Sequence, residues 1–292
     1  MLWPGQLLRT GTLQAPGTMR QILVISSHVA YGTIGLTPMV APLQQAGIEV
    51  TTLPTIVLSN HPGLRRVAGK AVEPALLEDM TAALDANGWL GTFDAILSGY
   101  LPSAGHVAWV KAVVERLREL NPSVVYVCDP ILGDDPVGLY IDDAAAVAVR
   151  DTLVPVADVL TPNRFELAWL SGVDVQSVQD AVSAARILAR PKLAATSIPS
   201  GRAELANLLI TERGVLVGKV EKLDRVPHGT GDLFAGLLTA ELLQGAPDAA
   251  ALGRAAGGVK HALDISRDSD RLLLSMMNWT HGIEPARIES LS

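Results

Sequence analysis

The chain has 292 residues, of which 49% are hydrophobic, so it can bury a sizeable core in one large α/β domain or in two smaller ones. Its 23 Lys and Arg residues against 30 Asp and Glu residues give a net charge of −7, which argues against a nucleic-acid partner. Cys128 is the only cysteine, which excludes an intramolecular disulfide and favours a reducing, cytoplasmic compartment. No run of 18 consecutive apolar residues occurs, so we predict no segment that crosses a membrane.

The start of the chain differs from the rest in composition. Residues 1–18 have Arg9 as their only charged side chain, contain several Pro and Gly residues, and lack the apolar run of a secretory signal. We predict a disordered leader at 1–18 and one folded domain at 19–292. Met19 stands directly before the first strand-like run, so Met1 and Met19 both stay open as the natural start.

From residue 20 onward, short β-branched runs alternate with amphipathic runs. The predicted strands are 21–26, 48–58 with a break at Pro54, 95–98, 123–128, 158–160, 193–196, 205–211 and 215–220. The predicted helices are 38–46, 73–86, 104–120, 164–170, 177–189, 230–244 and 247–263. This order predicts a single three-layer α/β/α domain, with a mainly parallel central sheet flanked by helices and binding loops at the carboxyl ends of the strands.

The tract Gly229-Thr230-Gly231-Asp232 lies directly before an apolar helix. Its glycines let the backbone approach an anion, and the free N–H groups of a helix start favour negative charge. Asp232, in the same first turn, could take a proton from a substrate hydroxyl. The tract could equally be a capped helix start without chemistry. It matches neither the Walker phosphate loop nor the dinucleotide fingerprint.

Two further groups of polar residues follow predicted strands. Asp129 opens an acidic loop after strand 123–128 and could bind Mg²⁺ together with phosphate oxygens, although a solvated Asp-Pro turn is the alternative. Asn163 and Glu166 follow strand 158–160 with the spacing of a capping box, which explains them without any ligand. The segment 133–142 has the glycines and acids of a mobile cover over a site.

Residues near strand ends could form the wall that binds the phosphoryl acceptor: Ser27, Thr55, the triad Ser59-Asn60-His61, and Tyr100. Ser27 is expected to begin a loop after the first strand. Each of these residues, taken singly, could be an ordinary loop residue.

Six segments together resemble the pyridoxal kinases of the ribokinase-like superfamily. They are Q-I-L-V-I-S-S-H at 21–28, T-I-V-L-S-N-H at 55–61, L-S-G-Y at 97–100, Y-V-C-D-P-I-L-G-D at 126–134, L-T-P-N-R-F-E at 160–166 and H-G-T-G-D-L-F at 228–234. The resemblance covers nearly everything from Arg20 to about Leu263. It implies a ribokinase-like fold and phosphorylation by ATP of the 5′-hydroxymethyl group of pyridoxal, pyridoxine or pyridoxamine in vitamin B6 salvage.

The resemblance also implies roles for single residues. Asp232 would be the base, and the N–H groups of Gly229, Thr230 and Gly231 would form the anion hole. The set implied around ATP is Asp129, Asn163, Glu166, Thr196, Ser197 and Thr230, with Asp129 and Glu166 organising Mg²⁺. The set implied around the pyridine ring is Ser27, Thr55 and Tyr100. A monovalent cation such as K⁺ near the anion hole and a homodimer are implied as well.

The chain departs from the family pattern at Val57, where members commonly have Gln, and the stretch 199–203 is short for an ATP-binding loop. Two alternatives therefore stay open. One is a ribokinase-like kinase for another heterocyclic alcohol, notably hydroxymethylpyrimidine. The other is a protein that binds B6 vitamers without turnover.

Overall fold

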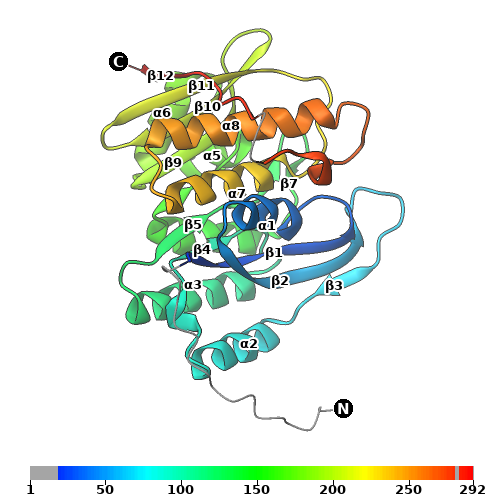
Figure 1. Ribbon diagram of the computed structural model, residues 1–292, viewed down its shortest axis with the longest axis vertical. Coiled ribbons are helices and arrows are strands. Elements are labelled where there is room, and N and C mark those ends of the chain that lie inside the picture. Colours follow the sequence, from blue (N-terminus) through cyan, green and yellow to red (C-terminus); the bar gives the residue numbers. More distant parts are fainter. Residues whose placement is uncertain (1–18, 280–282, 292) are drawn as a thin grey trace.

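The computed structural model describes residues 19–279 and 283–291 of the chain. The leader predicted at 1–18 lies outside the described residues. Figure 1 shows a central twisted sheet with helices on both of its faces.

The sheet has ten strands in the order β12-β11-β10-β9-β8-β5-β4-β1-β2-β3. Their bounds are β1 (Gln21–Tyr31), β2 (Glu49–Asn60), β3 (Gly69–Ala71), β4 (Ala95–Ser98), β5 (Val125–Cys128), β8 (Val159–Leu160), β9 (Lys192–Pro199), β10 (Glu204–Thr211), β11 (Gly214–Glu221) and β12 (Ile288–Leu291). The pairs from β2 through β1, β4, β5 and β8 to β9 are parallel. The outer pairs, β2 with β3 and β9 through β12, are antiparallel. The prediction of a mainly parallel sheet is therefore confirmed.

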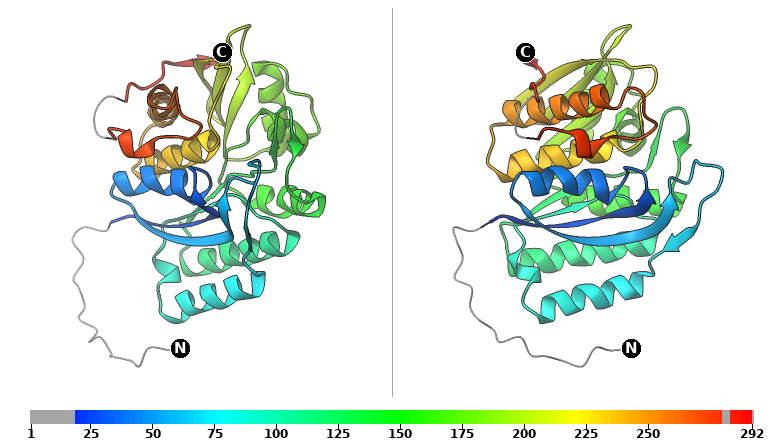
Figure 2. Two further views of the ribbon diagram at one scale, coloured as in Figure 1. Left: turned by 90° about the vertical axis from the view of Figure 1, so that its right-hand side faces the viewer. Right: turned by 45° about the vertical axis from the view of Figure 1, so that its right-hand side comes forward.

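Helices cover both faces of this sheet (Figure 2). Their bounds are α1 (Leu36–Gln45), α2 (Pro74–Ala86), α3 (Ala104–Leu120), α4 (Asp143–Ala148), α5 (Arg164–Ser171), α6 (Val178–Leu188), α7 (Thr230–Leu243) and α8 (Asp248–Ile265). Shorter helical turns lie at Leu90–Thr92, Val149–Leu153, Val154–Val156 and Leu274–Met276. In both views of Figure 2, α1, α7 and α8 lie on one side of the sheet, and α2 and α3 lie on the other.

The core has two halves, one on each face of the sheet, and β1 shows why. Ile22 and Val24 belong to the apolar cluster on the α1, α7 and α8 side, whereas Leu23 and Ile25 belong to the cluster on the α2 and α3 side. All four side chains are fully buried. A strand with helices on both of its faces has a continuous apolar run, which is why the pattern at 21–26 predicts a strand.

Two predictions for the first two strands were wrong. The strand predicted to end at Ser26 continues to Tyr31, so Ser27 lies inside β1 and not in a loop. The break predicted at Pro54 does not occur, and β2 runs through it. The β1–β2 register shifts between Ser26 and His28, directly after the pair formed by Ser26 and Pro54. Such an irregularity accommodates a residue that has no N–H to donate.

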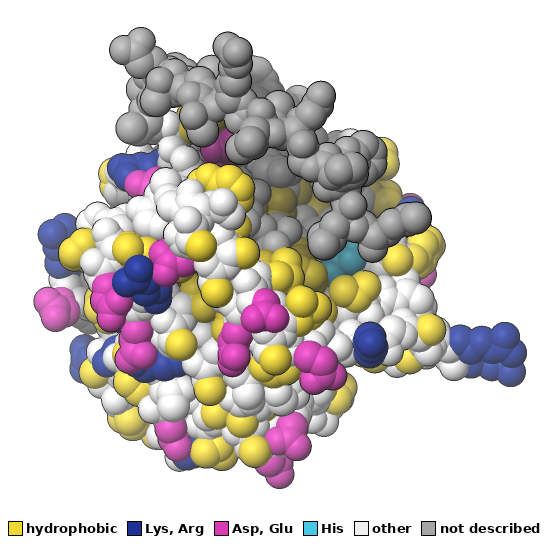
Figure 3. Space-filling view, turned by 90° about the horizontal axis from the view of Figure 1, so that it is seen from below, with side chains coloured by type: hydrophobic (Ala, Val, Ile, Leu, Met, Phe, Trp, Pro, Cys, Tyr) yellow, Lys and Arg dark blue, Asp and Glu magenta, His cyan; other side chains and the backbone are white. Residues whose placement is uncertain are grey.

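Among residues 19–279 and 283–291, no helix is long and apolar enough to cross a membrane. On the face drawn in Figure 3, Lys and Arg side chains are scattered among acidic, neutral and apolar ones and form no continuous basic patch.

Candidate active site

The parallel strands end at one edge of the sheet, and the segments that follow them are hydrogen-bonded to one another. The amide of Asp129, after β5, donates to the carbonyl of Ser98 at 2.8 Å, and that of Thr161, after β8, donates to Cys128 at 3.1 Å. The amide of Thr196 in β9 donates to Pro162 at 3.0 Å. This ladder aligns the first residues of two loops with the strand β9, as expected where the carboxyl ends of parallel strands meet.

The start of α7 has the geometry of an anion site. Gly229 is the N-cap, with a left-handed φ of 94°, and no side chain caps the helix. A Cβ at Gly229 would lie 2.0 Å from the carbonyl oxygen of Thr33, so only glycine fits. A Cβ at Gly231 would meet nothing within 4 Å, which leaves open space beside the first-turn amides. These amides have no acceptor within the helix and favour an anion there.

The carboxylate of Asp232 lies where two helices begin. Its Oδ2 accepts a hydrogen bond of 2.9 Å from the amide of Gly35, the N-cap of α1, with φ 62°. Its Oδ1 is buried and, within the described part of the chain, has no hydrogen-bond partner. Burial raises the pKa of Asp232 to about 7, and the bond from Gly35 lowers it in part. A carboxyl group of this kind can take up and release a proton near neutral pH.

Gly35 also brings Ser27 close to Asp232. A Cβ at Gly35 would lie 2.2 Å from Oγ of Ser27 and 2.3 Å from its carbonyl oxygen. Ser27 is 7% exposed, inside β1. A residue predicted for the substrate wall thus lies beside the predicted base.

Two further carboxylates are buried near Asp232. Asp129 is 5% and Glu166 is 3% exposed. Asp129 Oδ1 accepts a bond of 2.8 Å from the hydroxyl of Thr161. Burial raises the pKa of Asp129 well above its usual range, and the nearby charges of Glu166 and Asp232 raise it further. The carboxylates of Asp129, Glu166 and Asp232 therefore share one electrostatic environment. No Lys or Arg side chain of the described residues is among the main influences on the pKa values of these three groups.

Glu166 has a structural role and an electrostatic role. With Asn163 it forms a capping box at the start of α5, as the alternative interpretation of the sequence held. Glu166 Oε2 accepts from the amide of Asn163 and Oε1 from that of Leu132, each at 2.9 Å. Burial raises the pKa of Glu166 to about 7, although these amides and that of Gly133 lower it in part. The cap and the acidic site are thus built from the same side chain.

The buried carboxylates of Asp129 and Glu166 suit a divalent cation that takes the rest of its coordination shell from water and bound phosphate. Within 19–279 and 283–291 no three His, Cys, Asp or Glu side chains are grouped so that they alone could chelate a metal ion. Both oxygens of Glu166 already accept amide hydrogen bonds, whereas the described partners of Asp129 include one side-chain donor, Thr161. Mg²⁺ commonly takes one or two carboxylates and completes its shell with water and phosphate oxygens. Asp129 suits that role, with Glu166 as a more distant charge.

Two hydroxyl groups hold the backbone of Tyr100, which follows β4. Thr55 is fully buried in β2, and its hydroxyl donates to the carbonyl of Tyr100 at 2.6 Å. The amide of Tyr100 donates to Oγ of Ser26 at 3.2 Å. The Thr55 hydroxyl is therefore engaged with the protein, while the half-buried Tyr100 follows β4 at the same edge of the sheet.

Comparison with known proteins agrees with this geometry. A family model described as phosphomethylpyrimidine kinase matches residues 43–272. The pyridoxal kinase PdxY of Corynebacterium diphtheriae is 32% identical over 274 residues, which cover 92% of this chain and 97% of that protein. The pyridoxine/pyridoxal/pyridoxamine kinase of Bordetella avium is 35% identical over 263 residues, 87% and 88% of the two chains. The solved pyridoxal kinase of Leishmania donovani in complex with ADP and pyridoxine has a TM-score of 0.88 at 29% identity, covering 93% of this chain and 99% of that one.

The chain belongs to the pyridoxal kinase family. The resemblance drawn from the six sequence segments is confirmed, and so is the ribokinase-like fold that it implied. The roles of single residues were inferred from that resemblance and stay predictions.

The cover predicted at 133–142 is a hairpin in this member of the pyridoxal kinase family. β6 (Gly133–Asp134) pairs with β7 (Gly138–Leu139), and Nδ2 of Asn163 donates to the carbonyl of Gly133 at 2.9 Å. Tyr140 follows the hairpin, and burial together with the charges of Glu166, Asp232 and Asp129 raises its pKa. The hairpin therefore adjoins the acidic cluster. Its movement stays a prediction.

The remaining predicted residues lie on β9. Thr196 forms an isolated parallel bridge with Asn163 and is half-buried. Ser197 is exposed, with a left-handed φ of 60° that a serine rarely adopts. Both residues follow the ladder that carries Asp129 and Asn163, which fits a place beside a bound nucleotide.

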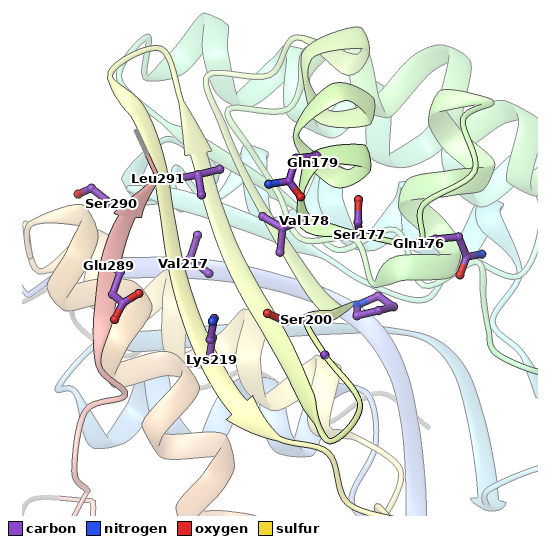
Figure 4. A pocket seen from close by; sticks show the side chains of 12 residues that line it. Gln176, Ser177, Val178, Gln179, Ser200, Val217, Lys219, Glu289, Ser290 and Leu291 are labelled. Carbon is purple, nitrogen blue, oxygen red and sulfur yellow. The ribbon is translucent and has the colours of Figure 1, made fainter.

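A cavity of about 510 Å³ lies elsewhere, between β12 and the start of α6 (Figure 4). In Figure 4, Val217 and Lys219 rise from β11 toward this space, and Glu289 faces it from β12. Pro199, Ser200 and Gly201, from the stretch compared above with an ATP-binding loop, line this cavity, but none of the single residues predicted for the active site does. The acidic cluster and the anion site, and not this cavity, hold the groups expected of a kinase.

Sequence reasoning missed two contributors to the site. Gly35 was not among the predicted residues, and no local signal marked it, because the helix that it caps was predicted to begin only at Pro38. His61 was among the residues considered for the substrate wall, but it was not predicted to lie beside His228. The fold brings their rings into contact.

Proposed function

We propose that the chain is a pyridoxal kinase, which transfers the γ-phosphoryl group of ATP to the 5′-hydroxymethyl group of pyridoxal, and also of pyridoxine and pyridoxamine. The observation that carries this proposal is the Asp232 carboxylate. One of its oxygens is held by the amide of Gly35, and the other is buried beside the first-turn amides of α7 without a described partner. A hydroxyl group that donates to Oδ1 would lie next to an anion site.

In this mechanism each group of the chain has one task. Asp232 takes the hydroxyl proton as the oxygen attacks phosphorus, and the bond between the γ-phosphorus and the β–γ bridging oxygen breaks to leave ADP. The N–H groups of the Gly229 to Asp232 turn bind the charge of the transferred phosphoryl group. Mg²⁺, when bound at Asp129 with Glu166 nearby, would neutralise charge on the phosphates. The hairpin beside the cluster would exclude water.

The nucleotide and the vitamer would lie on opposite sides of Asp232. Asn163, Thr196, Ser197 and Thr230 would contact the nucleotide, in keeping with their place after β8, in β9 and at the start of α7. Ser27, Tyr100 and Thr55 would bound the ring site, with Thr55 acting through the backbone of Tyr100. The exposed Val57 offers no polar group where relatives commonly have Gln, so fewer hydrogen bonds to the ring are expected.

A panel assay with ATP and Mg²⁺ tests the function. Pyridoxal, pyridoxine and pyridoxamine are each expected to yield a phosphorylated product. A product from hydroxymethylpyrimidine alone would instead support the second candidate, which the phosphomethylpyrimidine kinase description of the family model favours. Tight vitamer binding without ATP consumption would support a binding protein.

Three further properties belong to this proposal. K⁺ would bind near the anion hole, which predicts a faster reaction in potassium than in sodium buffer. The protein would be a homodimer, which light scattering measures directly. It would act in the cytoplasm, in keeping with its single, buried and unpaired Cys128.

A further inference from the structure

The imidazole rings of His61 and His228 are stacked, with centroids 4.0 Å apart and an angle of 12° between their planes. His61 directly follows β2, the strand that carries Thr55. His228 directly precedes Gly229, the N-cap of the catalytic helix. The stack therefore joins the predicted substrate wall to the anion site.

On the first side, the stack holds the base of a loop. The connection between β2 and β3 projects from the body of the molecule (Figure 1). Its neck is closed by hydrogen bonds from the amide of Ser59 to the carbonyl of Ala68 at 2.7 Å and from the amide of Ala68 to Oγ of Ser59 at 2.9 Å. Asn60 Nδ2 donates to the carbonyl of Arg66 at 2.9 Å. The loop 61–67 is thus closed on itself at its base.

On the side of the anion site, His228 lies in a segment that is held in place by contacts with neighbouring segments. It forms an isolated bridge with Arg271, whose guanidinium lies 4.9 Å from the ring centroid of Tyr31. The hydroxyl of Thr33 donates to the carbonyl of Leu272 at 2.9 Å. Gly229 meets Thr33 at a distance that leaves no room for a side chain. His228 is therefore the ring of the stack that is fixed by its surroundings, and His61 is the ring at the base of the loop.

The stacked His61 ring is neutral. The amide of Gly63 donates to its Nδ1 at 3.0 Å, so Nδ1 is an acceptor and the ring proton resides on Nε2. Burial and the neighbouring His228 lower the pKa of His61, which favours the same neutral form. Two rings without mutual charge repulsion can stay in contact, and aromatic pairs of this kind strengthen an association by about 3- to 10-fold.

We propose that His228 is a positioning residue, which holds the base of loop 61–67 against the catalytic turn through its ring contact with His61 and so keeps the vitamer site closed on that side. This inference rests on the proposed function for its kinetic consequence but not for its structural one. His228 need not touch the substrate.

Two variants separate ring contact from other effects of His228. His228→Ala removes the ring, and His228→Phe keeps a ring without the nitrogens. In His228→Ala we expect the KM for pyridoxal to rise about 3- to 10-fold, with kcat and the KM for ATP changed less than about 2-fold. His228→Phe is expected to restore the KM for pyridoxal. Because His228 is exposed, both variants should fold, which a thermal melt confirms.

Hydrogen exchange gives a second readout that needs no activity. A peptide that covers 59–68 should exchange faster in His228→Ala than in the wild type, since the amides of Gly63 and Ala68 lose protection, and His228→Phe should return it to the wild-type rate. Unchanged exchange in His228→Ala, or equal loss in both variants, would overturn the proposal. If the wild type phosphorylates no vitamer, the proposed function fails, while the exchange comparison still decides the role of the stack.

Discussion

The amide of Gly35 donates to Oδ2 of Asp232 across 197 positions of sequence, at 2.9 Å. This bond joins the first turn of α1 to the first turn of α7, and these two helices pack together on one face of the sheet. It fixes one oxygen of the carboxylate and leaves the other, which is buried, without a hydrogen-bond partner among the described residues. The reactivity proposed for Asp232 thus depends on a glycine from the other end of the chain.

Replacement of Asp232 by Asn should preserve binding and abolish most of the turnover. Asn retains an oxygen that can accept from Gly35 but cannot take a proton. We expect kcat to fall about 10²- to 10⁴-fold, with the KM values for ATP and pyridoxal within about 3-fold. Steady-state kinetics measures both. A variant with wild-type kcat would remove Asp232 from the mechanism.

The same variant should be more stable than the wild type above neutral pH. Burial raises the pKa of Asp232 to about 7, from an ordinary value of 3.8, so the folded state holds this proton more tightly than the unfolded state. The wild type therefore loses stability as the pH rises from about 4 through about 7, whereas Asp232→Asn lacks this loss. At pH 8 its free energy of unfolding should exceed that of the wild type by about 1–3 kcal/mol. Urea unfolding at pH 5 and pH 8 measures the difference, which should shrink at pH 5.

The rate should follow the same ionisation in the opposite sense, because the base acts in its deprotonated form. We expect kcat/KM for pyridoxal to fall below about pH 7 with a slope of one proton. A pH–rate profile from about pH 5.5 to 8.5 measures this limb. A profile that stays flat across that range would contradict the raised pKa of the base.

Gly229→Ala should cost both stability and activity, and Gly245→Ala is its matched control. Both glycines have positive φ, 94° and 75°, and they lie at opposite ends of α7. A Cβ at Gly229 would meet the carbonyl oxygen of Thr33 at 2.0 Å, whereas a Cβ at Gly245 would meet nothing within 4 Å. We expect Gly245→Ala to lose about 1 kcal/mol and keep its activity, and Gly229→Ala to lose about 2–4 kcal/mol and most of its kcat. Equal behaviour of the two variants in melts and assays would contradict the close approach.

Asn163→Ala tests the shared cap, with Ser177→Ala as its control. Both residues are helix N-caps whose side chains accept from a backbone amide, and each replacement should cost about 0.5–2 kcal/mol. Asn163 also donates to Gly133 and lies at the acidic cluster, whereas Ser177 caps α6. Only Asn163→Ala should raise the KM for ATP. The comparison fails if Ser177→Ala raises this KM as much.

Much of the fold could be predicted from local patterns. The helix at 104–120 and the strand at 95–98 have the predicted bounds, because apolar periodicity, Ser103 and Asn121-Pro122 mark them clearly. The short strands β3, β6, β7 and β12 were not predicted, because they lack the buried apolar runs that mark β4 and β5. The predicted end of β1 at Ser26 was wrong because small polar residues are typical of strand ends, whereas pairing with β2 extends this strand.

The sequence allowed us to predict which residues follow strands at the site, but not which of those residues contact one another. Asp129 and Glu166 could be found because each follows a buried strand by a short spacing. The bond of Gly35 to Asp232 and the stack of His61 on His228 link segments far apart in the chain, and no local pattern encodes such a pair. The Thr55 hydroxyl, assigned to the substrate wall by position, proved to be bonded to a carbonyl of its own protein.

One carboxylate, that of Glu166, both starts α5 and contributes to the charge of the acidic cluster. Under the proposed function, selection on nucleotide use and selection on heat resistance therefore act on the same atoms. Among variants around Asn163 and Glu166, thermal inactivation and nucleotide affinity should change together, and a thermostable version of the enzyme is more readily sought at α6 or β12 than here.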